Sequence, residues 1–136
     1  MSTYGQFCPV ARSVDLLGDR WTFLVIRELL SGSRYFNQIH RGLPRMSRTL
    51  LSQRLRTLAR AGLVRRDDAG DRVTYSLTRA GRELRPVIQA LGSWGTRWLD
   101  GPPAEDDIDP QMLLWELKRT SGPVSLGEST VHVKFV

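Results

Sequence analysis

The stretch MSRTLLSQRLRTLARAGLVRR, residues 46–66, constrains the fold of this chain more than any other part of the sequence. Plotted at about 100° per residue, residues 47–61 place leucines on one side of a helix, namely Leu50, Leu51, Leu55 and Leu58. The opposite side is polar or basic and carries Thr49, Ser52, Gln53, Arg56 and Arg60, with Arg48 at the edge. The pattern predicts a helix capped by Ser47 that buries its leucines and exposes its basic face.

The same stretch lies inside a block of unbalanced charge. Residues 29–66 hold nine arginines and no acidic residue, whereas the 136-residue chain has a formal net charge of +6. Residues 100–136 hold three basic and seven acidic residues. A one-sided basic surface favours an anionic partner, and hydroxyl, amide and guanidinium groups suit base edges and phosphates. A solvated basic face is the alternative, but the missing acidic residues favour double-stranded DNA as the partner.

Three helices are expected before this one. Pro9 can begin the first, because its missing N–H would have no helical partner there, and Gly18 stops it. Asp19 is a suitable N-cap for a second helix, which ends at residues 31–32. Ser33 can cap a short third helix. Together with the helix over 47–61, these segments give a run of four helices.

A hairpin and a final helix are expected after it. Residues 64–77 contain two short runs around an Asp/Gly turn, and the second run alternates as a half-buried strand does. Thr78 then caps a long helix that runs toward Leu99, with Pro86 kinking it or starting its straight part. A mainly α chain with one small β-hairpin, in this order, indicates a winged helix-turn-helix.

Three segments also resemble a known family. CPVARSVDLLGDRWTFLVIRELLSG, FNQIHRGLPRMSRTLLSQRLRTLARAGLVRR and YSLTRAGREL are together similar to the HxlR-type transcriptional regulators, relatives of the MarR family, over about residues 8–99. The resemblance implies a homodimeric winged helix-turn-helix with its recognition helix over 47–61 and its wing over 64–77. The wing turn, RRDDAGDR, is shorter than is usual in the family, which argues against deep insertion into the minor groove.

Candidate DNA contacts come from the basic face, the basic block and the hairpin. The expected set is Arg34, Ser47, Arg48, Thr49, Ser52, Gln53, Arg56, Arg65, Arg66 and Arg72. The mixture of amide, hydroxyl and guanidinium groups favours sequence-specific binding, because phosphate contacts alone do not require it.

The final helix carries a wide apolar stripe. Its members are Leu84, Val87, Ile88, Leu91, Trp94 and Trp98. A small domain has little left to cover such a stripe, so we expect it to form a dimer seam with the N-terminal helix. The alternative is that the stripe closes the core of the monomer.

Cys8 is the one cysteine in the chain, so an internal disulfide cannot form. It precedes Pro9 at the expected start of a helix, where the helix dipole favours a reactive thiolate. The resemblance implies, for some relatives, a thiol switch at this cysteine. The alternatives are a small buried apolar residue at this position, or a small ligand bound near the tryptophans as the effector.

Several classes are not supported by the sequence. We find no nucleophile–base motif, phosphate-binding loop or catalytic carboxylate pair, and therefore expect no enzyme and no cofactor. His40 and His132 stand apart from any set with metal-ligand spacing, so no metal site is expected. The N-terminus does not resemble a signal peptide, and no stretch is apolar enough to span a bilayer. We therefore expect a cytoplasmic protein.

The expected domain organisation is a winged helix-turn-helix over 1–99, a linker over 100–110 and a helix and strand over 111–136. The last part weakly resembles the start of a sterol-carrier-like domain. The sequence thus predicts a homodimeric transcriptional regulator, favouring a repressor, on an inverted repeat. An oxidant or electrophile at Cys8, or a small ligand, would release it. The alternative is a non-regulatory interaction protein or a non-specific DNA binder.

Overall fold

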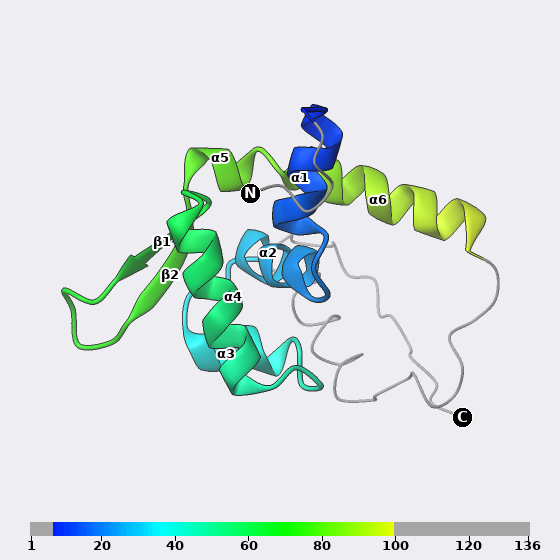
Figure 1. The fold of residues 1–136 in the computed structure, drawn as a ribbon. Coiled ribbons are helices and arrows are strands. Elements are labelled where there is room, and N and C mark those ends of the chain that lie inside the picture. Colours follow the sequence, from blue (N-terminus) through cyan, green and yellow to red (C-terminus); the bar gives the residue numbers. More distant parts are fainter. Residues whose placement is uncertain (1–6, 100–136) are drawn as a thin grey trace, which may run out of the picture. The chain divides into compact units, whose positions relative to one another are not determined.

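The computed structural model of the chain describes residues 7–99, which form six helices and one antiparallel hairpin (Figure 1). In chain order the elements are α1 (Pro9–Leu17), α2 (Thr22–Leu30), α3 (Phe36–Arg41), α4 (Arg48–Arg60), β1 (Val64–Asp67), β2 (Thr74–Leu77), α5 (Arg79–Arg82) and α6 (Arg85–Trp98). This order confirms the predicted winged helix-turn-helix. The linker over 100–110 and the helix and strand over 111–136 lie outside the described residues. Within residues 7–99, no helix combines the length and the hydropathy that a membrane crossing requires.

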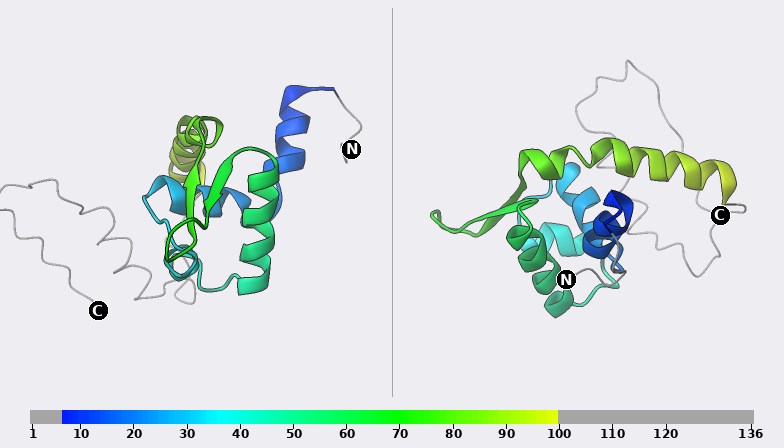
Figure 2. Two further views of the ribbon diagram at one scale, coloured as in Figure 1. Left: turned by 90° about the vertical axis from the view of Figure 1, so that its left-hand side faces the viewer. Right: turned by 45° about the horizontal axis from the view of Figure 1, so that its top comes forward.

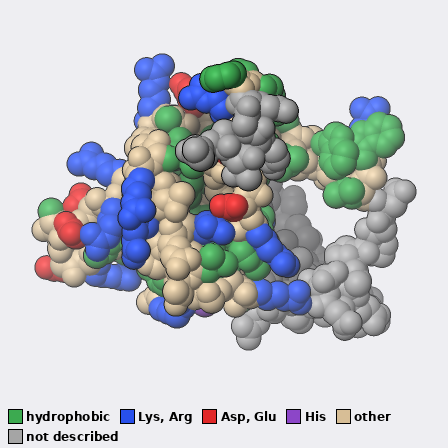
Figure 3. All heavy atoms as spheres, in the orientation of Figure 1, with side chains coloured by type: hydrophobic (Ala, Val, Ile, Leu, Met, Phe, Trp, Pro, Cys, Tyr) green, Lys and Arg blue, Asp and Glu red, His purple; other side chains and the backbone are tan. Residues whose placement is uncertain are grey.

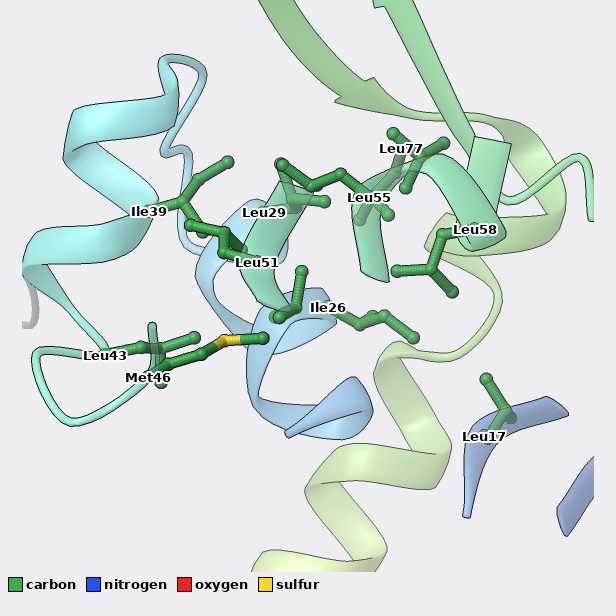
Figure 4. Close-up of a cluster of buried hydrophobic side chains, with 12 residues drawn as sticks. Leu17, Ile26, Leu29, Ile39, Leu43, Met46, Leu51, Leu55, Leu58 and Leu77 are labelled. Atoms are coloured by element: carbon green, nitrogen blue, oxygen red, sulfur yellow. The ribbon is translucent and has the colours of Figure 1, made fainter. Parts of the chain in front are cut away.

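The buried core is built mainly from α2, α3 and α4 (Figure 4). The leucine face of α4 points into it, since Leu51, Leu55 and Leu58 are each at most 1% exposed and Leu50 is half-buried. Facing residues come from α2, α3, the α3–α4 turn and the hairpin and include Val25, Ile26, Leu29, Ile39, Leu43, Met46, Val64 and Leu77. The helical wheel therefore identified the buried face of α4 correctly.

Both ends of α4 follow from its sequence. At the start, the Ser47 hydroxyl accepts the backbone N–H of Leu50 at 3.1 Å, as predicted for an N-cap. At the end, Gly62 has a φ of +79°, and the N–H of Leu63 donates to the carbonyl of Leu58 at 3.0 Å. This is the left-handed turn that glycine favours after a helix. Ser47 and Gly62 thus fix the length of the helix.

The predicted cap of α2 was wrong. Trp21, with a φ of +82°, is the N-cap residue, and no side chain caps the helix. The Asp19 carboxylate lies 3.5 Å from the guanidinium of Arg54 on α4, although its backbone carbonyl accepts the N–H of Thr22. Asp19 therefore joins the α1–α2 turn to α4 through its side chain and does not cap α2.

The predicted cap of α3 was also wrong. Tyr35 is the N-cap residue, not Ser33. The Gln38 side-chain oxygen accepts the backbone N–H groups of Arg34 and Tyr35 at 3.0 and 3.2 Å. Gln38, in the first turn of α3, thus supplies the acceptor for two N–H groups that precede the helix.

The final helix is divided in two. Thr78 caps α5, accepting the N–H of Gly81 at 3.3 Å, but α5 ends at Arg82 and α6 begins at Arg85. An unbroken helix would need an N–H at Pro86 to bond the carbonyl of Arg82, and proline has none. The expectation of one long helix was therefore wrong, whereas the role of Pro86 at the start of a straight segment is confirmed.

The hairpin and α6 lie on different sides of α2. β1 pairs with β2 with Val64 opposite Leu77 and Asp67 opposite Thr74, and β1 packs on α4 while β2 packs on α2. α6 also packs on α2, and its C-terminal half extends past the other described elements (Figures 1 and 2). This arrangement leaves α4 and the hairpin side by side on one surface.

Candidate nucleic-acid interface

The outward side of α4 forms an open hollow. Its volume is about 470 Å³ and no acidic residue lines it. The lining residues are Phe36, Arg48, Thr49, Ser52, Gln53 and Arg56. Five of these six were predicted as DNA contacts, and the structure brings them together on one helix face. Figure 3 shows basic side chains over α4 and the neighbouring hairpin.

Arg48 is held at one wall of this hollow by α3. Its guanidinium donates a short hydrogen bond to the side-chain oxygen of Asn37 and lies 5.4 Å from the centroid of the Phe36 ring. Neither Asn37 nor Phe36 was predicted as part of the site. A guanidinium fixed in this way keeps free donors toward solvent, because each arginine offers five N–H groups.

Two arginines of α4 face different ways. Arg54 turns toward Asp19 and its side chain is 22% exposed. Arg56 is exposed, and within residues 7–99 it forms no ion pair. The charge of Arg56 is therefore available to an external anion, whereas the charge of Arg54 is partly compensated by the carboxylate of Asp19.

The wing arginines divide in the same way. Both arginines are exposed, but Arg66 lies 2.9 Å from the carboxylate of Asp68, whereas Arg65 forms no ion pair within residues 7–99. Hydrogen bonding to Tyr75, its partner across the hairpin, and then to Asp68 raises the pKa of Arg66 further above its usual value. Arg66 thus stays charged at every accessible pH, with part of that charge compensated by Asp68.

Arg72 and Arg34 connect the wing to the start of α3. The Arg72 guanidinium stacks 3.8 Å from the centroid of the Tyr35 ring, and the carbonyl of Arg34 accepts the N–H of Tyr75 at 2.7 Å. Arg72 was predicted as a DNA contact, and the structure places its side chain on Tyr35. The Arg34 side chain is exposed but lies away from the α4 hollow.

The candidate dimer residues fall into two groups. Leu84 and Ile88 are half-buried and pack against the monomer core. The other four leave about half of their surface exposed and are Val87 (47%), Leu91 (51%), Trp94 (56%) and Trp98 (60%). On α1, Val10 is 69% exposed. Among residues 7–99, these side chains form an apolar surface that no described element covers.

Cys8 and His40 occupy well-defined places. Cys8 is the N-cap of α1, where its carbonyl accepts the N–H of Arg12 at 3.0 Å, and its side chain is exposed in the single chain. His40 Nε2 lies 2.8 Å from the carbonyl of Met46 in the α3–α4 turn. Across residues 7–99, no group of three His, Cys, Asp or Glu side chains could hold a metal ion.

The fold and this surface define a winged helix-turn-helix protein of the transcription-regulator class. Residues 16–102 match the HxlR-like helix-turn-helix family, and the chain belongs to it. It is 38% identical over 99 residues to the HTH-type transcriptional regulator YvaP of Bacillus subtilis, covering 70% of this chain and 92% of YvaP.

Two solved structures are similar to the described fold. The reduced form of the transcriptional regulator YodB of Bacillus subtilis has a TM-score of 0.62 and 31% identity, over 71% of this chain and all of YodB. The redox regulator HypR in its reduced form has a TM-score of 0.63 and 30% identity, over 68% of this chain and 95% of HypR. YvaP and YodB are named as transcriptional regulators and HypR as a redox regulator, and this chain, as a member of the HxlR-like family, is a transcriptional regulator.

Proposed function

We propose that this transcriptional regulator is a repressor that reads an operator through the outward face of α4. The observation that carries the proposal is the hollow on that face, where hydroxyl, amide and guanidinium groups gather without an acidic residue. Gln53 and Arg56 are the base-reading candidates, since glutamine pairs with adenine and arginine with guanine in the major groove. Ser47, Arg48, Thr49 and Ser52 complete the contact set.

The wing supplies the second part of this surface. Arg65 is exposed for a phosphate contact, and Arg66 adds charge that Asp68 partly compensates. The tip carries Asp68 and Asp71, next to Asp67 at the end of β1, and a phosphate backbone would repel these carboxylates. We therefore propose that the strands of the wing, and not its tip, approach DNA.

We propose that the active form is a homodimer on an inverted repeat. The exposed apolar residues of α6, with those of α1, provide a surface that a second copy would cover. A two-fold dimer places two α4 helices in successive major grooves, with half-sites about 34 Å apart.

A thiol signal at Cys8 is supported by its exposure and by the relatives. YodB has been solved in diamide-treated and quinone-bound forms, and HypR in an oxidised form. We propose that an adduct on Cys8 displaces α1 and thereby changes the spacing of the two α4 helices. A small ligand near the exposed tryptophans is the second candidate for the signal.

Selection of binding sites from a random DNA library tests the proposal. The expected result is an enriched inverted repeat that the protein binds about a thousandfold more tightly than scrambled DNA. Binding without an enriched sequence would favour the non-specific DNA binder. Absence of any DNA binding at low salt would favour an interaction protein that contacts other proteins.

A further inference from the structure

A second hollow lies between the end of α2, strand β2 and the α5–α6 junction. Its volume is about 350 Å³, which falls within the range of about 300–1,000 Å³ that is typical of small-molecule sites. Three arginines line it, namely Arg34, Arg82 and Arg85. None of its lining residues belongs to α4 or β1, so it is separate from the hollow on α4, although strand β2 of the wing and Arg34 form part of its wall.

Two of these arginines are fixed by main-chain carbonyls. Arg82 donates to the carbonyl of Leu77 at 2.9 Å, and Arg85 donates to the carbonyl of Leu30 at 3.1 Å. A carbonyl orients a guanidinium without neutralising its charge, and each guanidinium has further donors. Both side chains are thus held in place with N–H groups left for a ligand.

No carboxylate balances this charge. The residues that line the hollow include no Asp or Glu, and within residues 7–99 none of the three arginines forms an ion pair. The adjacent acidic residue, Glu83, lies 3.3 Å from Arg79 on α5. Three like charges around one hollow favour an anion, because a bound anion relieves their mutual repulsion.

The floor and rim restrict the kind of anion. Leu29 and Leu77 are at most 9% exposed and form apolar parts of the lining, while Ser33 and Ser76 add hydroxyl groups. An apolar floor below a cationic rim suits a molecule with an oxyanion at one end and a short apolar group at the other. A bare inorganic ion would leave the floor uncovered.

We propose that this hollow binds a small organic anion, a carboxylate or a phosphate ester with a compact apolar group. Arg82 and Arg85 hold the oxyanion, and the side chain of Arg34 closes on it from the α2–α3 turn. The carbonyl of Arg34 accepts the N–H of Tyr75 from the wing, so the ligand adjoins the hydrogen bond that links the wing to α3.

The test is a titration of the full chain followed by NMR, with phenyl phosphate, benzoate and inorganic phosphate as separate probes. The expected result is saturable shifts of amides around the hollow, with phenyl phosphate or benzoate binding more tightly than inorganic phosphate. Arg85→Gln should weaken binding of the organic probe about tenfold, as expected for the loss of a charge-assisted hydrogen bond. Arg79→Gln, on the same surface but outside the hollow, is the matched control and should leave binding unchanged.

If Arg85→Gln does not fold, a second variant still tests whether the hollow binds the organic anion. Ser76→Asp introduces a carboxylate at the rim and should abolish binding while the amide spectrum stays dispersed. Weak, non-saturable shifts for all three probes would overturn the proposal, as would equal losses in Arg85→Gln and Arg79→Gln. It would also be overturned if Arg85→Gln lowered DNA affinity and its salt dependence while no probe bound, since the hollow would then be a DNA phosphate contact.

Discussion

The guanidinium of Arg72 stacks on the ring of Tyr35, 3.8 Å from its centroid. Arg72 lies at the end of the wing turn, and Tyr35 is the N-cap of α3, so this contact joins the hairpin to the helix-turn-helix. The neighbouring hydrogen bond from the N–H of Tyr75 to the carbonyl of Arg34 reinforces it. Since a two-stranded hairpin is marginally stable alone, these contacts help to hold the wing against the start of α3.

Tyr35→Leu should weaken operator binding by about two- to fivefold, because an exposed cation–π pair contributes about 0.5–1 kcal/mol. The dependence of affinity on salt should not change, since no phosphate contact is lost. Fluorescence anisotropy over a series of salt concentrations measures both quantities.

Tyr35→Phe keeps the aromatic face and is the matched control, with affinity near that of the wild type. Arg72→Gln should repeat the effect of Tyr35→Leu, and the double variant should add little to either. If Arg72→Gln instead reduces the salt slope by about one while Tyr35→Leu has no effect, Arg72 is a phosphate contact and the stack has no positioning role.

Gly42→Ala should destabilise the fold by about 1–3 kcal/mol, the usual cost of overpacking. A Cβ at Gly42 would lie 2.2 Å from Oε2 of Glu28. The side chain of Glu28 is completely buried and paired with Arg27, so the carboxylate has little room to move. Urea denaturation measures the free energy of unfolding, and Gly70→Ala is the control because a Cβ there meets nothing within 4 Å. Equal stabilities of the two variants would show that α2 and the α3–α4 turn are not closely packed at this point.

Leu91→Glu should convert a dimer to a monomer and reduce operator affinity. Leu91 is 51% exposed on the apolar side of α6, and a buried unpaired carboxylate in an interface is strongly unfavourable. Light scattering at micromolar concentration measures the oligomeric state. Gln89→Glu adds the same charge at another exposed position of α6 and is the matched control. A wild-type monomer that still binds the operator with full affinity would contradict the assignment of α6 to the dimer seam.

Oxidation of Cys8 should release operator DNA. Diamide joins two thiols in a disulfide, so Cys8 pairs with a small thiol or with a second Cys8 while diamide is reduced to the hydrazine. A gel-shift assay with and without diamide should show release for the wild type, reversal by dithiothreitol, and no response for Cys8→Ser. Release that is equal in both proteins would assign the signal to another group.

The helix of the candidate interface could be predicted because its information is local. The leucine spacing of α4, its serine cap and its terminal glycine all lie within residues 47–62, and the structure retains each of them. The break before α6 could also have been placed, since Pro86 cannot donate the hydrogen bond that an unbroken helix requires.

The supporting contacts could not be predicted because they join residues far apart in the sequence. Arg48 and Asn37 are eleven residues apart, and Arg72 reaches Tyr35 only after the hairpin folds back toward α3. The cap predicted at Asp19 failed for the same reason, since Arg54 attracts its carboxylate. A sequence pattern shows which side chains are polar, but the choice among several polar partners depends on tertiary distances.

If the outward face of α4 reads base sequence, as we propose, paired titrations of two variants will show it. Gln53→Ala and Arg56→Ala are each compared with the wild type on the selected operator and on scrambled DNA, with Arg79→Ala as a control outside the surface. Each variant should lose about 1–3 kcal/mol of discrimination against scrambled DNA, the value of one bidentate base contact. Equal losses on operator and scrambled DNA, with the discrimination unchanged, would contradict this proposal and reduce the α4 face to a phosphate-binding surface.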